Sequence, residues 1–168
     1  LYADDEDVYL ARMQEIADGH PKVGSAYFYE YKSERVAQLP LGEYVYVAAS
    51  RLTGLTLPQT LIAAKFFLPV ILFLLVYAFL FRLLPSESSR LRTVGALAGS
   101  LVAVIGYDFV SVSEMARLFT GGDIGVRLSL WTRPVNPILG AIGVFGWLLL
   151  VWEVYVNARW WKMLLAGL

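Results

Sequence analysis

The sequence predicts an all-α fold, a multi-spanning membrane helical bundle with an extracytoplasmic helical first loop. Apolar residues make up 58% of the 168 positions, whereas soluble globular chains contain roughly 45–50%. Apolar runs with few charges recur along the second part of the chain, and short basic segments separate them. A helix needs about 20 mainly apolar residues to cross the ~30 Å hydrocarbon core of a bilayer. These runs therefore predict membrane-spanning helices.

The composition excludes several classes of function. The formal net charge is zero, so no overall field favours nucleic acid as a partner. The chain has no cysteine, which excludes disulfides, thiolate metal sites and cysteine nucleophiles. His20 is the single histidine, so a multi-histidine metal site is excluded as well. Because the sequence starts at Leu1 and stops inside an apolar run, we expect it to be a piece of a longer membrane protein.

Residues 1–58 contain no spanning run, and we expect them to form the extracytoplasmic loop. A first helix is expected over residues 5–17, where acidic residues in the first turn complement the helix dipole. Gly19 is a natural stop just past its last turn. A second helix is expected over about residues 41–52, with Gly54 as its stop.

The first spanning helix is expected over about residues 59–84. Thr56 can cap the amide of Gln59, Gln59 can reach back to Thr56, and Pro58 is tolerated in a first turn. At ~1.5 Å per residue, a helix of about 25 residues exceeds the ~30 Å core. Lys65 lies near its first end, where the amine can reach the interface.

The membrane domain is expected to occupy residues 59–168. It should hold two further spans, over about residues 93–112 and 137–156, and the start of another at residue 163. Two glycines four residues apart in the second span have a spacing that favours close packing against a neighbouring helix.

The charge pattern predicts the orientation in the membrane. The segments 82–92 and 157–162 are short and basic, which places them in the cytoplasm. Residues 1–58 then lie on the outer face of the cytoplasmic (inner) membrane.

Three motifs occur in a fixed order along the chain. Residues 5–9 read Asp-Glu-Asp-Val-Tyr at a helix start, residues 39–44 read Leu-Pro-Leu-Gly-Glu-Tyr, and residues 133–137 read Arg-Pro-Val-Asn-Pro. In these motifs, their order and their expected sidedness, the chain resembles the N-terminal part of the GT-C superfamily of integral-membrane glycosyltransferases. That superfamily includes protein O-mannosyltransferases and aminoarabinose transferases. The latter often have Lys-Pro-Pro where this chain has Gln38 before Leu39 and Pro40, so it lacks their phosphate-binding lysine.

The resemblance implies that a sugar is moved from a polyprenyl-phosphate-linked donor to a glycan, lipid or protein acceptor on the extracytoplasmic face, with inversion. Such a transfer needs a carboxylate that takes the proton of the acceptor. By its match to the motif, Asp5 is the expected base. Asp4 and Glu6 would orient it, raise its pKa by like-charge proximity, or help to hold a divalent cation. Asp4 and Asp5 are the expected ligands of that cation, Mg²⁺ or Mn²⁺. We expect the chain alone to be inactive.

Four residues are expected to bind the substrates: Arg133, Tyr9, Lys65 and His20. The donor phosphate is anionic and lies at the membrane surface, where the Arg133 guanidinium can bind it through two hydrogen bonds. Lys65 is a weaker candidate for the same phosphate. Tyr9 belongs to the acidic motif, and His20 is a candidate for a second proton-handling group.

Each assignment has a plainer alternative. The four acids can form a solvated first turn, Arg133 can be an interfacial anchor, and His20 can be a loop histidine bonded to backbone. At the level of the protein, the alternatives are a transporter or flippase of lipid-linked sugars and a non-catalytic membrane scaffold. Transporters usually carry ionisable groups near the bilayer midplane. The expected spans are nearly free of central charges, which favours the enzyme.

Overall fold

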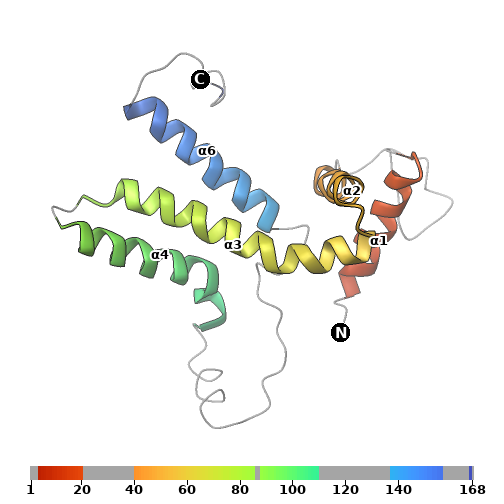
Figure 1. Ribbon diagram of the computed structural model, residues 1–168, viewed down its shortest axis with the longest axis horizontal. Coiled ribbons are helices and arrows are strands. Elements are labelled where there is room, and N and C mark those ends of the chain that lie inside the picture. The colour runs from red at the N-terminus through yellow and green to blue at the C-terminus, as the bar shows by residue number, and fades with distance from the viewer. Residues whose placement is uncertain (1–3, 21–39, 86–87, 110–136, 157–166, 168) are drawn as a thin grey trace, which may run out of the picture. The chain divides into compact units, whose positions relative to one another are not determined.

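The computed structural model describes residues 4–20, 40–85, 88–109, 137–156 and 167. All regular structure in these residues is helical: α1 (Asp4–Ala17), α2 (Leu41–Thr53), α3 (Leu57–Leu83), α4 (Ser89–Phe109) and α6 (Ile138–Val156) (Figure 1). The all-α prediction is confirmed for this part of the chain. The chain divides into two compact units, residues 1–64 and residues 65–168, which we describe separately.

Local sequence signals set the ends of these helices. α2 stops at Gly54, which has a left-handed φ of 73° and donates its N–H to the Ser50 carbonyl at 2.9 Å. Gly19, with φ 94°, follows α1 in the same way. α3 opens with the expected reciprocal cap: the Thr56 N–H donates to Gln59 Oε1 at 3.0 Å, and the Gln59 N–H donates to Thr56 Oγ1 at 3.4 Å. The predicted capping box is confirmed.

The first unit is organised by the packing of α1 on α2. Its buried apolar side chains come from both helices and from the first turns of α3: Met13, Ile16, Tyr46, Val47 and Leu61. On α1 the buried positions follow helical spacing, so one side of the helix faces the core. Pro40, just before α2, is fully buried as well.

In its described residues, the second unit contains α4, α6 and the greater part of α3. Its core is apolar and takes Leu72 and Val76 from α3, Val104 from α4 and Ile138 from α6. The rings of Phe79 and Phe145 meet edge to face across α3 and α6, with centroids 6.0 Å apart.

The two glycines of the second expected span meet α3. A Cβ on Gly99 would lie 2.7 Å from Leu80 Cδ1, and one on Gly95 would lie 3.2 Å from Leu84 Cδ1. The close packing predicted from their spacing is therefore confirmed, and α3 and α4 run antiparallel.

α4 begins at Ser89, four residues before the expected start. Arg90 and Arg92 thus belong to its first turn rather than to the preceding loop.

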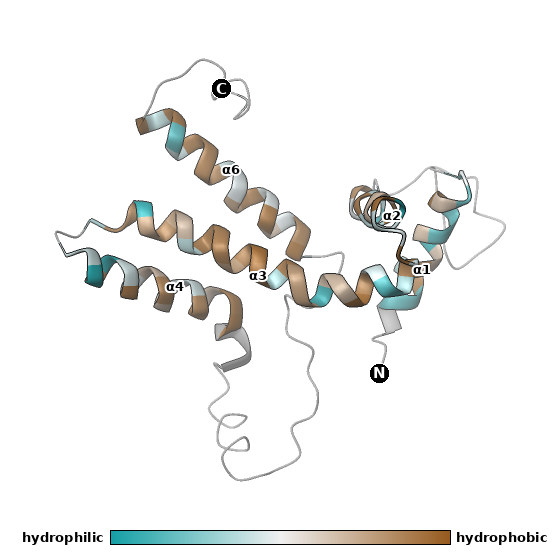
Figure 2. Cartoon of the chain, in the orientation of Figure 1, coloured by the Kyte–Doolittle hydropathy of each residue, from teal (hydrophilic) through white to brown (hydrophobic). Residues whose placement is uncertain are grey.

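α3 and α6 are long and apolar enough to cross a membrane; within the described residues no other helix meets this test. Only 11% of the most apolar window of each helix is buried, and brown residues dominate both in Figure 2. A core helix of a soluble protein would be mostly buried. The two helices therefore indicate membrane association.

The other expected spans stay predictions. α4 carries Arg90 and Arg92 at its start and Asp108 near its end, and this charge lowers its hydropathy. The start expected at residue 163 lies outside the described residues.

Candidate functional site

The acidic motif forms the first turn of α1, which starts at Asp4. Glu6 is only 5% exposed, whereas the next residue, Asp7, is exposed. The plainer alternative of a fully solvated acidic turn therefore does not hold for Glu6. The side chains of Asp4 and Asp5 lie outside what the structure describes, so their roles as base and metal ligands stay predictions.

A buried ion pair joins α1 to α2. Arg12 Nε lies 3.0 Å from Glu43 Oε1, and the two side chains are 17% and 4% exposed. Removing one partner of such a pair typically costs about 3–5 kcal/mol, because the other charge stays buried and uncompensated. Asp5 precedes Arg12 by seven residues, so the two backbone positions share one side of α1. The pair therefore fixes the side of α1 on which position 5 lies.

A second polar contact holds the other end of α1. Arg51 Nη2, from the last turn of α2, donates to the Ala17 carbonyl at 3.0 Å. Ala17 is the last residue of α1, where helix carbonyls lack partners within the helix, and a cation there also complements the helix dipole. Arg12 and Arg51 thus attach α1 to α2 at two levels, which limits rotation of α1 about its own axis.

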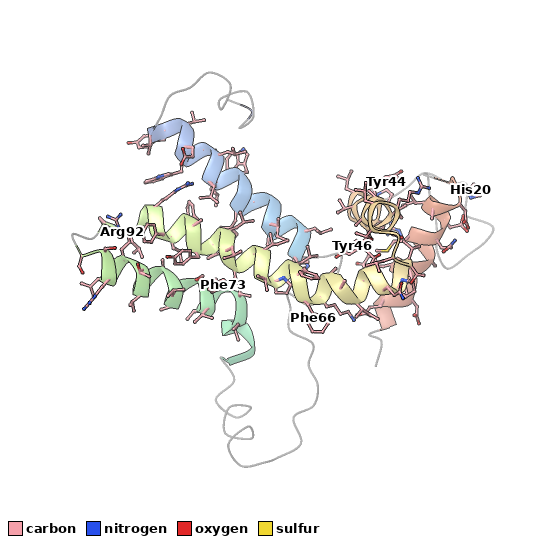
Figure 3. All side chains as sticks on the ribbon, in the orientation of Figure 1. His20, Tyr44, Tyr46, Phe66, Phe73 and Arg92 are labelled. Carbon is pink, nitrogen blue, oxygen red and sulfur yellow. The ribbon has the colours of Figure 1, made fainter. Side chains whose placement is uncertain are left out.

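Tyr46 lies in the core of the same unit, 3% exposed. Burial raises the pKa of its phenol well above the ordinary value of 10.0, because the charged form would lose its solvation. The hydroxyl therefore stays protonated at any ordinary pH. In Figure 3, Tyr46 belongs to the group of side chains around α2.

Of the expected substrate-binding residues, Tyr9 and His20 lie toward opposite ends of α1. Tyr9 is half-buried one turn after Asp5. His20 lies past the opposite end of α1 (Figure 3), about 20 Å along the helix from Asp5 at ~1.5 Å per residue. Its Nδ1 lies 3.4 Å from Glu15 Oε2 and its side chain is 63% exposed, so it does not share the acidic turn.

Of the two expected phosphate-binding cations, Lys65 belongs to the described part of the chain. Lys65 is half-buried in α3 and opens the second unit. Arg133 lies outside the described residues. Within the described residues no group of three or more His, Cys, Asp or Glu side chains could hold a metal ion. The divalent cation stays a prediction that depends on Asp4 and Asp5.

Two ion pairs between helices were not anticipated from the sequence. Arg12 and Glu43 are 31 positions apart, and nothing in their spacing links them. The second pair joins α3 to α6, with Arg82 Nη2 at 3.1 Å from Glu153 Oε1. Here a signal existed, because an acidic residue inside an apolar span usually has a specific partner.

No protein family, curated protein or solved structure matches the chain. The role of the acidic turn is therefore inferred from its own residues and from the helices that hold it.

Proposed function

We propose that the chain belongs to a membrane glycosyltransferase that moves a sugar from a polyprenyl-phosphate donor to an acceptor on the outer face of the cell envelope. One observation carries the proposal. A carboxylate-rich helix start is attached to α2 by a buried Arg12–Glu43 pair, and α2 leads within three residues into an apolar helix long enough to cross a membrane. A lipid-linked sugar and a fixed general base could meet at such a place.

The proposed reaction is a single displacement at the anomeric carbon. An oxygen or nitrogen of the acceptor attacks that carbon, the bond from the carbon to the phosphate oxygen breaks, and polyprenyl phosphate leaves with the electron pair. The carboxylate of Asp5 takes the proton that the acceptor loses. Attack on the face opposite the leaving group inverts the configuration. Arg133 would neutralise the leaving phosphate.

The distribution of charge favours this enzyme over a transporter of lipid-linked sugars. Between Lys65 and Arg82, α3 carries no charged residue. In α6 the acid Glu153 lies close to the end and is 3.1 Å from Arg82. Transport pathways usually need ionisable groups near the midplane, and the described parts of α3 and α6 offer none there.

The test replaces Asp5 by Asn in the intact protein and measures sugar transfer from a polyprenyl-phosphate donor. Loss of a general base typically costs about 10²–10⁴-fold in rate, and we expect a decrease of that size. Asp7→Asn is the matched control, because Asp7 is exposed on the same turn of helix; it should keep the parental rate. Undiminished transfer by Asp5→Asn would remove the proposed base.

The role of Arg133 has its own test. Arg133→Ala should weaken binding of polyprenyl phosphate, measured with the sugar-free lipid so that chemistry does not enter. Unchanged lipid binding would exclude Arg133 as the phosphate ligand.

A further inference from the structure

α2 has a second apolar side that nothing in the described part of the chain covers. Four exposed residues form it at helical spacing: Leu41, Val45, Ala48 and Leu52. Leu52 is 87% exposed, Leu41 67% and Val45 53%. Their spacing of four, three and four residues places all four on one stripe along the helix.

This stripe is opposite the side of α2 that faces the core. The buried residues of α2 are Glu43, Tyr46 and Val47, and Glu43 contacts α1 through Arg12. At 100° per residue, these positions lie on the other half of the helix from the stripe. Surface helices of soluble proteins have one apolar side and one polar side, so α2 departs from that pattern.

The chain keeps α2 close to the membrane. Only Gly54, Leu55 and Thr56 separate the end of α2 from the start of α3. α3 has 27 residues and is therefore about 40 Å long, some 10 Å more than the ~30 Å hydrocarbon core. The headgroup layer on each side is about 5–7 Å thick. The start of α3 is therefore expected at the level of the headgroups, and the three-residue connection keeps the last turn of α2 near it.

We propose that α2 is an interfacial helix that lies along the outer surface of the bilayer, with Leu41, Val45, Ala48 and Leu52 inserted among the lipid chains. The apolar stripe supplies the buried area that holds such a helix at the boundary between headgroups and acyl chains. Glu43 and α1 then lie on the water side. This inference rests on the membrane association of α3 and not on the proposed transferase activity.

The test uses single-cysteine labelling, which the absence of native cysteine allows. A nitroxide is attached at Val45→Cys or Leu52→Cys in the intact protein reconstituted in lipid bilayers. Its collision rates with oxygen, which concentrates in lipid, and with a water-soluble nickel chelate are measured. Ala11→Cys and Gln14→Cys, on the exposed side of α1, are the matched controls. Circular dichroism verifies that each labelled variant keeps its helical content.

We expect the oxygen collision rate to exceed the nickel rate at Val45 and Leu52, and the reverse at Ala11 and Gln14. Two results would overturn the proposal. Nickel collision rates at the stripe equal to those of the controls would place α2 in water. Protection from both reagents would show that protein covers the stripe, either residues 21–39 or a second copy of the chain.

Discussion

In the described part of residues 1–64, α1 and α2 are joined by charged contacts as well as by apolar ones, whereas in the described part of residues 65–168 the contacts between α3, α4 and α6 are mainly apolar. The Arg12–Glu43 pair and the Arg51 hydrogen bond connect α1 to α2. In the second unit, the contacts of Leu72, Val76, Val104 and Ile138 dominate. Charges there lie near the helix ends, where Arg82 meets Glu153 and Arg92 stacks over the Phe81 ring at 5.4 Å.

The difference agrees with the proposed surroundings of each unit, lipid for the second and the outer membrane surface for the first. Between lipid-facing helices, apolar burial gives little driving force because lipid tails are as apolar as leucine, so close packing has to hold the helices together. At a water-facing unit, a buried ion pair contributes little net stability but penalises every arrangement that separates its partners. The stability of the first unit is therefore expected to be sensitive to the loss of a single charge. The stability of the second unit is expected to be sensitive to changes in side-chain volume where its helices touch.

The largest expected effect is the loss of one buried charge. Glu43→Ala removes the carboxylate that lies next to Arg12 and should destabilise the α1–α2 packing by about 3 kcal/mol. Hydrogen exchange of α1 amides should become roughly 100-fold faster, while α6 amides are unaffected. Equal exchange rates in α1 before and after the substitution would contradict the dependence on charge.

The second unit should respond to shape instead. Gly99→Val places a side chain against Leu80, whose Cδ1 would lie 2.7 Å from the new Cβ, and overpacking of this kind costs about 1–3 kcal/mol. Gly143→Val is the matched control, because a Cβ there meets nothing within 4 Å. In detergent, the melting temperature of Gly99→Val should be lower than that of Gly143→Val. Equal decreases in melting temperature would show that α3 and α4 are not tightly packed.

Alkaline pH should loosen the first unit. Burial raises the pKa of Tyr46 above its unfolded value near 10.0, so the folded form retains a proton that the unfolded form loses. The stability from this group is complete below about pH 10 and falls above it, by up to about 1.4 kcal/mol per pH unit. Hydrogen exchange of α2 amides between pH 9 and 11, corrected for the intrinsic rate, measures the loss. Tyr46→Phe should abolish this pH dependence, and its persistence would assign the effect to another group.

The smallest effect is expected for the pair of the second unit. The side chains of Arg82 and Glu153 are 41% and 29% exposed, and exposed pairs contribute about 0–1 kcal/mol. Glu153→Gln should therefore lower the melting temperature in detergent only slightly, with Trp152→Phe next to it as a conservative control. A loss of stability as large as that caused by Glu43→Ala would show that the burial of an ion pair does not determine how much it contributes in the two units.

The local features of the fold could be predicted from the sequence. Gly54 as a stop and the Thr56–Gln59 cap depend on residues within one turn of each other, so short-range rules suffice. The start of α4 was expected too late, because Arg90 and Arg92 were assigned to a polar loop although arginine is a good helix former. Polar composition alone does not end a helix.

The contacts that shape the candidate site could not be predicted. Arg12 and Glu43 come together only when α1 packs on α2, and no local rule gives that register. The spacing of Gly95 and Gly99 predicted close packing but not Leu80 and Leu84 as the partners. The residue types of the acidic turn can be read along the chain, whereas the burial of Glu6 and the distance of His20 from the turn are known only from the structure.

A pair of double-mutant cycles tests the central claim most directly, that a buried ion pair holds the helix of the acidic turn. The cycles compare Arg12→Met with Glu43→Gln, and Arg82→Met with Glu153→Gln. We predict a coupling of about 1–3 kcal/mol for the first pair, in the range of residues that share a salt bridge, and of less than about 1 kcal/mol for the second. Couplings of equal size, or none between Arg12 and Glu43, would contradict the claim.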